Sequence, residues 1–259
     1  MPQRSYVIVT PTTMAGVHGE WIEVKQVASA RVILYLHGGA YYMGSCESHR
    51  SLCWRLARAA KARVLLIEYR LAPEDPFPAA VEDAVGVYKE LIHGGEYTPA
   101  SIAIAGDSAG GGLTAATLLS LRDANIELPA CAVLLSPWTD LAGTGESMTT
   151  RASYDPWLDP DSIRKAPALY TSEETLTHPL ASPLYADLHG LPPLLIHVGD
   201  HECLLDDSTR FAEKAEAAGV DVTLHIWDEM WHVFQSFPMP EADVAIAEIG
   251  GFVQKHIPD

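Results

Sequence analysis

Residues 102–113 read IAIAGDSAGGGL and combine an apolar run, a serine between two glycines and a series of small residues. The apolar run before Gly106 predicts a buried strand, and the small residues after Ser108 open a predicted helix over 109–124. Gly106 and Gly110 flank Ser108 in the pattern G-x-S-x-G, which is a weak signal by itself. Between a strand and a helix the pattern is specific, because a serine on such a sharp, strained turn is presented to a substrate. We therefore predict that Ser108 is a nucleophile.

Outward from this turn, the chain alternates apolar strand patterns with helical patterns, which is typical of a mostly parallel sheet covered by helices. We expect eight strands, at residues 6–10, 21–27, 32–36, 64–69, 102–105, 132–135, 194–198 and 222–227. We expect helices at residues 48–60, 78–92, 109–124, 204–218 and 241–256. The sequence thus predicts a single α/β domain over residues 1–259.

The alternation is interrupted between the sixth and seventh predicted strands. Residues 138–193 are rich in Thr, Ser, Asp, Pro and Leu, and they are too many for a plain connection in a compact domain. Within this segment, residues 159–170 have a pattern compatible with a helix. We therefore predict an inserted lid at 138–193 and not a linker.

The composition narrows the partners that the protein can have. The formal net charge of −17 argues against sequence-independent binding of nucleic acid and against an anionic membrane surface. No apolar run approaches the roughly 20 residues of a spanning helix, and the N-terminus lacks the pattern of a secretory signal. The four cysteines show no metal-binding spacing. We expect a cytoplasmic protein that acts on a small molecule, without a metal, nucleic acid or membrane partner.

A second glycine-containing turn follows the predicted strand at 32–36. It reads YLHGGAY over residues 35–41, and its small residues let backbone N–H groups face a substrate oxygen. The same His-Gly-Gly string at 93–95 follows a helix instead, so we interpret it as a helix C-terminal turn. The predicted oxyanion hole consists of Gly38, Gly39, Ala40 and Ala109, with the N–H groups of the last three as donors.

A serine nucleophile on this kind of turn is followed in the chain by an acid and then by a histidine. His232 lies directly after the last predicted strand, where the base belongs. The strand at 194–198 runs into Gly-Asp-His-Glu-Cys-Leu-Leu-Asp-Asp, which offers four carboxylates. The usual position, about three residues past the glycine and before an apolar helix start, selects Glu202. The open alternatives are Asp200, Asp206 and Asp207.

These motifs together resemble the bacterial hormone-sensitive-lipase-like esterases, a branch of the α/β-hydrolases. Residues 69–80, YRLAPEDPFPAA, and residues 136–141, SPWTDL, look like further signatures of that family. The resemblance implies hydrolysis of short-to-medium acyl esters without a metal or organic cofactor. It also supports Glu202 as the acid. Because family members often pair through an edge strand, it implies a possible homodimer through residues 222–227.

Two features depart from the family pattern. Ala40 stands where the family usually has a third glycine, and its methyl group can narrow the pocket. His37 comes so early that the preceding chain has room for two strands but not for the family's N-terminal cap helices. We therefore expect a comparatively open acyl pocket. Tyr41 and Trp231 are candidate pocket residues, because they neighbour catalytic elements and such pockets are mostly apolar.

The sequence therefore predicts a serine carboxylesterase that works through an acyl-enzyme, with Ser108, Glu202 and His232 as its triad. An amidase or peptidase with the same triad is the alternative within enzymes. A ligand-binding protein that keeps the fold, as the related plant gibberellin receptors do, is the alternative outside enzymes. Those receptors lack a complete triad, whereas this chain has a serine, a carboxylate and a histidine in the required order.

Overall fold

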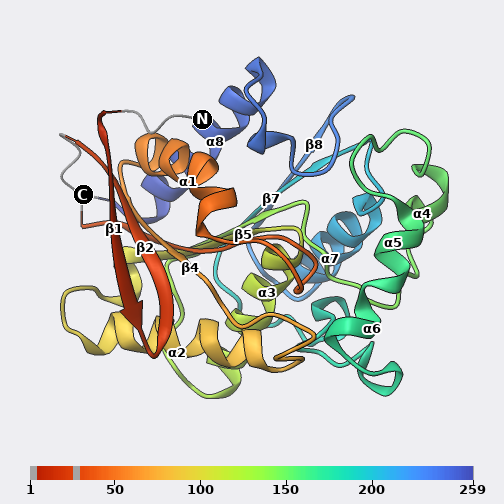
Figure 1. The fold of residues 1–259 in the computed structure, drawn as a ribbon, viewed down its shortest axis with the longest axis horizontal. Helices are drawn as coiled ribbons and strands as arrows, with labels where there is room; N and C mark the ends of the chain where they lie inside the picture. Colours follow the sequence, from red (N-terminus) through yellow and green to blue (C-terminus); the bar gives the residue numbers. More distant parts are fainter. Residues whose placement is uncertain (1–4, 26–29, 259) are drawn as a thin grey trace.

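A sheet of eight strands runs through the protein, whose computed structural model describes residues 5–25 and 30–258 (Figure 1). The strands are β1 (Val7–Met14), β2 (Val17–Val24), β3 (Val32–Leu36), β4 (Arg63–Ile67), β5 (Ile102–Asp107), β6 (Cys131–Leu135), β7 (Leu194–Gly199) and β8 (Val222–Trp227). Their order in the sheet is β1-β2-β4-β3-β5-β6-β7-β8. The pairs β1–β2 and β2–β4 are antiparallel, and all other pairs are parallel. The predicted mostly parallel α/β sheet is confirmed.

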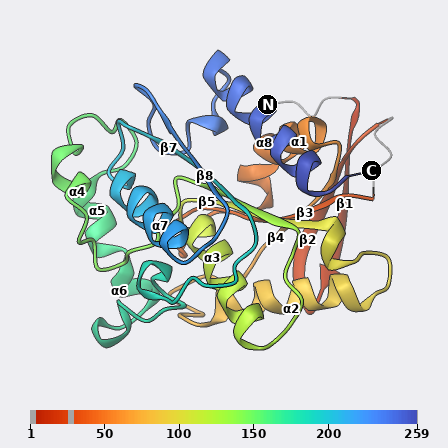
Figure 2. The same cartoon turned by 180° about the vertical axis from the view of Figure 1, so that it is seen from behind.

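Helices cover both faces of this sheet (Figures 1 and 2). One face carries α1 (Cys46–Ala60) and α8 (Pro240–His256), which contact each other. The other face carries α2 (Ala79–His93), α3 (Ala109–Asp123) and α7 (Leu205–Ala217). Each of the predicted helices is confirmed, with both ends within two residues of the prediction. Short 3-10 helices η1 (Pro99–Ser101) and η4 (Phe234–Ser236) lie in the connections.

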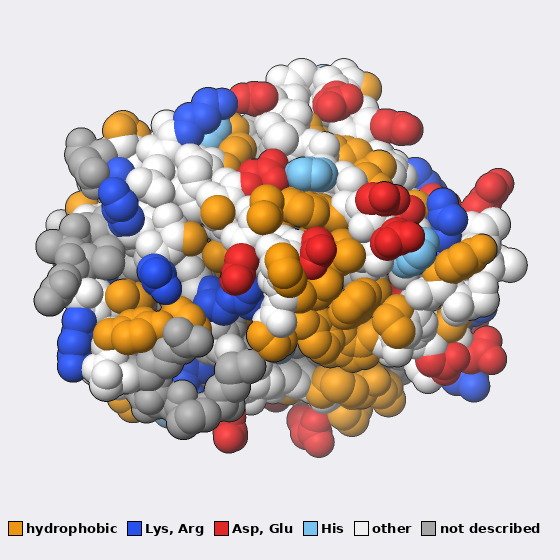
Figure 3. Space-filling model, turned by 90° about the horizontal axis from the view of Figure 1, so that it is seen from above, with side chains coloured by type: hydrophobic (Ala, Val, Ile, Leu, Met, Phe, Trp, Pro, Cys, Tyr) orange, Lys and Arg blue, Asp and Glu red, His pale blue; other side chains and the backbone are white. Residues whose placement is uncertain are grey.

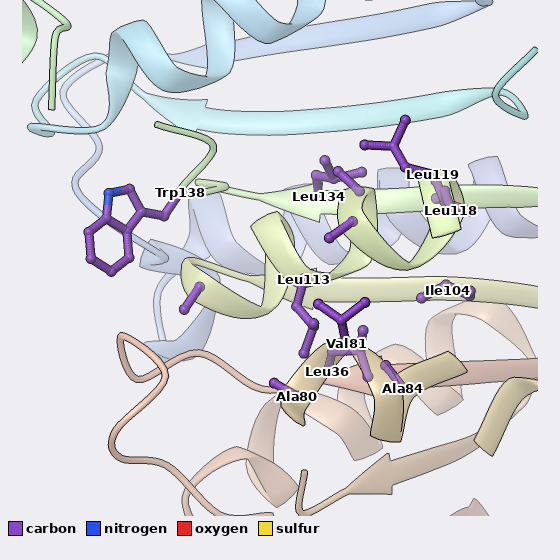
Figure 4. Close-up of a cluster of buried hydrophobic side chains, with 14 of the residues drawn as sticks. Leu36, Ala80, Val81, Ala84, Ile104, Leu113, Leu118, Leu119, Leu134 and Trp138 are labelled. Carbon is purple, nitrogen blue, oxygen red and sulfur yellow. The ribbon is translucent and has the colours of Figure 1, made fainter. Parts of the chain in front are cut away.

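The central strands are buried on both faces, as their continuous apolar runs predict. On the α2 and α3 side, Leu113 of α3 lies in one buried cluster with Leu36 and Ile104 of the sheet and Val81 of α2 (Figure 4). Burial of a leucine of this kind contributes about 1.5–3 kcal/mol. Because α3 begins directly after Ser108, this packing also fixes the turn on which the serine lies.

The N-terminal hairpin differs from its prediction, which placed strands at 6–10 and 21–27. β1 and β2 are each eight residues long and are joined by a two-residue turn with positive φ at both positions. Pro11 obscured the first strand, but proline is tolerated there because β1 is the edge of the sheet. Gly19 obscured the second strand, and the structure needs it because a Cβ there would collide with the backbone of β4. Positions 26–27 of the predicted strand lie outside the described residues.

Residues 138–193 connect β6 to β7 and contain only short elements. These are α4 (Ser147–Thr150), α5 (Pro160–Lys165), α6 (Pro167–Tyr170), η2 (Glu173–Thr175) and η3 (Pro183–Tyr185), of which α4, α5 and α6 lie together at one end of the molecule (Figure 1). The predicted helical pattern at 159–170 is confirmed, with a break at Ala166 between α5 and α6. The Ser147 N–H donates to Asp206 Oδ2 at 2.9 Å, which fastens the insertion to the start of α7. Its role as a lid stays a prediction.

The surface carries both charged and apolar regions. Seen from above, hydrophobic side chains gather in one broad area, with acidic side chains around it (Figure 3). Within the two described ranges, none of the helices combines the length and apolar character that crossing a bilayer requires. β8 is the other edge of the sheet and exposes Ile226, which agrees with the strand expected to pair in a homodimer. The dimer and the cytoplasmic location stay predictions.

Candidate active site

Ser108 occupies the turn between β5 and α3, where the sequence places it. Its φ of +54° and ψ of −122° lie outside the regions that L residues favour, so the turn is strained. The Ser108 N–H donates to the carbonyl of Leu135 at 2.8 Å, and its own carbonyl accepts from the Trp138 N–H at 2.9 Å. A Cβ at Gly106 or Gly110 would collide with the backbone at the end of β3. The two glycines of the G-x-S-x-G pattern therefore allow the backbone of the serine turn to lie close to the end of β3.

The predicted oxyanion loop follows β3 and has an unusual backbone. Gly39, Ala40 and Tyr41 have φ values of +123°, +51° and +65°. For the two residues that are not glycine, this left-handed conformation costs on the order of 1 kcal/mol each. Across the described parts of the chain, the N–H groups of Gly39, Ala40 and Ala109 donate no hydrogen bond. They are therefore available to an oxygen of a bound ligand.

Contacts between buried aromatic rings hold this strained loop in place. The ring of His37 stacks on Tyr69 with centroids 4.3 Å apart, and the Tyr69 hydroxyl donates to the His37 carbonyl at 2.6 Å. Burial lowers the pKa of His37 to about 4, so the ring is neutral at pH 7. Tyr41 is 1% exposed and stacks on Tyr170 of the insertion with centroids 3.8 Å apart. Tyr41 thus packs the loop, and its contact with a substrate stays a prediction.

Asp107, which sequence reasoning missed, joins the serine turn to the oxyanion loop. Its buried Oδ1 accepts from the Tyr35 hydroxyl at 2.8 Å and from the Gly38 N–H at 3.1 Å, and Oδ2 lies 3.3 Å from His49 Nε2. Burial alone would raise the pKa of Asp107, but His49 and Tyr35 stabilise its charged form and lower the pKa below its usual value. The place of Gly38 in the oxyanion hole stays a prediction. Its N–H is engaged, and it provides space, because a Cβ would collide with Asp107.

Glu202 and His232 form a buried pair. Glu202 Oε2 lies 2.6 Å from His232 Nδ1, and both side chains are almost completely shielded from solvent. Glu202 Oε1 accepts from the Gly199 N–H at 2.7 Å and from the Ser136 hydroxyl at 2.8 Å. Ser136 in turn accepts from the Val233 N–H at 3.1 Å, which ties it to the loop that carries His232. These bonds hold the carboxylate in a single orientation, in which Oε1 accepts from Gly199 and Ser136 and Oε2 faces the His232 imidazole.

The three alternative carboxylates are engaged elsewhere. Asp200 Oδ1 accepts from the Glu229 N–H at 2.7 Å and connects the loops after β7 and β8. Asp206 accepts from the insertion, as described above. Asp207 Oδ1 accepts from the N–H groups of Thr139 and Asp140 at 2.9 and 2.8 Å. Each has a structural partner, and Glu202 is the one of the four that contacts His232.

Aromatic side chains border the imidazole. Trp157 of the insertion lies edge-on to His232 with centroids 6.5 Å apart, and it also contacts Phe237 at 4.9 Å. Trp157 is half exposed, so the insertion brings an accessible aromatic ring to the base. Trp231 contacts Phe237 with centroids 5.5 Å apart and is partly buried. Its place in a substrate pocket stays a prediction.

A cavity of about 510 Å³ lies within the insertion, since every residue that lines it belongs to 138–193. Its apolar lining includes Trp138, Leu141, Met148, Ile163 and Leu176. Trp138 connects this cavity to the serine turn, because its N–H donates to the Ser108 carbonyl. A space of this size and character suits a small organic group.

Comparison with known proteins decides the family. The family model described as alpha/beta hydrolase fold matches residues 33–236, which is most of the chain. The chain belongs to the α/β-hydrolase fold family. Like other members, this α/β-hydrolase has its serine on the turn after β5 and its histidine on the loop after β8.

Individual relatives specify the branch of the family. An acetyl-hydrolase of Streptomyces hygroscopicus is 46% identical to this α/β-hydrolase over 93% of the chain and 81% of the relative. An esterase of Acinetobacter venetianus is 40% identical over 97% and 83%, respectively. A solved esterase from the bacterial hormone-sensitive lipase family has a TM-score of 0.97 and 49% identity, covering 99% of this chain and 87% of the other. The resemblance to hormone-sensitive-lipase-like esterases is confirmed, and the protein is a carboxylic ester hydrolase.

Proposed function

We propose that this esterase is a serine carboxylesterase with Ser108 as nucleophile, His232 as general base and Glu202 as the acid. The observation that carries the proposal is the 2.6 Å hydrogen bond between His232 Nδ1 and Glu202 Oε2. A histidine whose Nδ1 donates to a carboxylate has its Nε2 free to accept a proton. Such a base suits a serine on the turn between β5 and α3.

Acylation of Ser108 is the first half of the proposed reaction. His232 accepts the hydroxyl proton while Oγ attacks the ester carbonyl, and Glu202 stabilises the imidazolium that forms. The N–H groups of Gly39, Ala40 and Ala109 donate to the tetrahedral oxyanion. Loss of one such donor costs about 3 kcal/mol in other serine hydrolases. The alcohol leaves after it receives the proton from His232.

Deacylation follows the same path with water in place of the alcohol. His232 removes a proton from water, which attacks the acyl carbonyl and releases the acid and Ser108. We propose that the cavity of about 510 Å³ within the insertion receives the acyl chain. Its largely apolar lining suits the hydrocarbon part of an ester, and short-to-medium chains are the proposed substrates.

The decisive experiment compares p-nitrophenyl butyrate with p-nitrophenyl palmitate for the wild type and Ser108→Ala. We expect wild-type turnover of butyrate, little turnover of palmitate, and none of either by the variant. Turnover that survives Ser108→Ala would refute the proposal.

An amide substrate is the second candidate, because the same triad can cleave amides. The comparison of p-nitrophenyl butyrate with butyryl p-nitroanilide separates the two. We expect kcat/KM to be larger for the ester. A larger value for the anilide would identify an amidase.

A further inference from the structure

Three side chains with metal-binding atoms meet on the sheet face that α8 covers. His197 of β7 and His225 of β8 are direct partners in the register of two parallel strands, so their side chains lie on the same face. Glu248 of α8 points toward both histidines. Its Oε2 lies 3.5 Å from His197 Nε2 and 2.9 Å from His225 Nδ1. One ligand atom from each of the three residues lies within 4.8 Å of the other two.

The buried member of this cluster is incompletely satisfied. His197 has no exposed surface, and neither of its ring nitrogens makes a hydrogen bond within the described parts of the chain. Buried polar atoms are nearly always paired, and an unpaired one is costly. A neutral imidazole nitrogen offers a lone pair to a metal ion. The pair of His225 with Glu248 would be an ordinary surface contact by itself, but it does not account for His197.

We propose that His197, His225 and Glu248 bind a Zn²⁺ ion. Two imidazoles and one carboxylate form a ligand set that Zn²⁺ takes in proteins, at about 2.0–2.2 Å from each ligand. In a tetrahedral site these bonds place ligand atoms about 3.3 Å apart. The observed separations from Glu248 Oε2, 3.5 and 2.9 Å, bracket that value. The fourth ligand is water, because the side chains of His225 and Glu248 are 42% and 35% exposed.

Neighbouring contacts orient the accessible ligand. The ring of His225 stacks on Trp227 with centroids 4.1 Å apart and planes inclined by 17°. Trp227 also lies 5.5 Å from the ring of His197. The two imidazoles are therefore held before a metal arrives, which reduces the ordering that binding must cost.

The ion would stabilise the elements that carry the active-site residues, and it would not contact the reacting atoms. It would connect β7, β8 and α8. The loop that carries His232 runs from the end of β8 to the start of α8, and Glu202 follows β7. A bound ion would therefore hold both ends of the His232 loop and the strand that leads to Glu202. We expect metal binding to raise the thermal stability of the protein.

The test measures Zn²⁺ binding to chelator-treated protein by equilibrium dialysis and by thermal melting. The variants are His225→Ala and Glu248→Gln, whose partly exposed side chains make correct folding the expectation. The matched control is His189→Ala, because His189 forms an exposed pair with Asp187 at 2.6 Å and is not a member of the cluster. We expect wild type and control to bind one Zn²⁺ per chain, with melting raised by about 5 °C at a hundredfold excess over Kd.

We expect both cluster variants to bind Zn²⁺ at least about 100-fold more weakly, since each removes a ligand. Co²⁺ in place of Zn²⁺ should give the visible absorption of a tetrahedral site in the wild type and in the control only. Absence of stoichiometric binding by the wild type would overturn the proposal. Zn²⁺ binding that persists unchanged in both cluster variants would also overturn the proposal. If that persistent binding also abolished esterase activity, the ion would lie at His232 and not at the cluster.

Discussion

The exchange Glu202→Gln tests the proposed acid with almost no change in shape. Glu202 Oε1 accepts from the Gly199 N–H and the Ser136 hydroxyl, and Oε2 faces His232 Nδ1. Because a backbone N–H can only donate, the oxygen of the glutamine must take the position of Oε1. Its NH₂ group then faces Nδ1 as a donor.

His232 must respond by accepting at Nδ1 and carrying its proton on Nε2, where a general base needs its lone pair. We expect kcat to fall about 10⁴-fold, as the corresponding exchange does in serine proteases, which adds about 5 kcal/mol to the barrier. KM should change by less than about threefold, because Glu202 is buried and does not face the substrate.

The matched control is Asp200→Asn. Asp200 Oδ1 accepts from the Glu229 N–H, and an asparagine oxygen can accept the same bond, so we expect activity within about threefold of the wild type. The assay is the initial rate on p-nitrophenyl butyrate, with melting curves to confirm that both variants fold. A Glu202→Gln enzyme that keeps more than about a tenth of wild-type kcat would refute the reasoning, as would an Asp200→Asn enzyme that is the more impaired.

Three further predictions concern stability and the cavity. Burial lowers the pKa of His37 to about 4, so the neutral ring contributes fully to stability above about pH 6.5, and this contribution is lost as the pH falls toward 4. Chemical denaturation should show that the free energy of unfolding falls by about 3 kcal/mol over that range. The His37→Gln variant should lack this fall. Leu113→Ala should lower the free energy of unfolding by about 2–5 kcal/mol, because its side chain is fully buried against the sheet, and a change below about 1 kcal/mol would contradict the packing. Ile163→Trp should reduce the rate on p-nitrophenyl octanoate relative to butyrate by about tenfold, since Ile163 lines the proposed acyl cavity; an unchanged ratio would place the acyl chain elsewhere.

The fold could be predicted from the sequence wherever the pattern of apolar residues matches the burial of the element. The central strands are apolar throughout, and the flanking helices have one apolar face, so their positions could be predicted within two residues. The N-terminal hairpin could not, because Pro11 and Gly19 are residues that strands usually avoid. Their acceptance depends on the sheet edge and on the close approach of β4, which are features of the assembled sheet.

Some residues of the candidate site could likewise be predicted from the sequence, and others could not. Ser108 and His232 are recognisable because the chain order of strands and turns identifies them. The contacts of Asp107 and Ser136 could not be predicted, since each depends on residues far away in the chain. The choice of Glu202 over three nearby carboxylates required spacing and resemblance, whereas its contact with His232 is a property of the folded loops.

Covalent labelling tests whether Ser108 is the nucleophile. Diethyl p-nitrophenyl phosphate transfers its phosphoryl group to an activated serine, and the modified peptide can be identified by mass spectrometry. We expect one label per chain on Ser108, loss of esterase activity in proportion to labelling, and no label on the Ser108→Ala variant. Complete inhibition with the label on another residue, or full activity after Ser108 is labelled, would contradict that role.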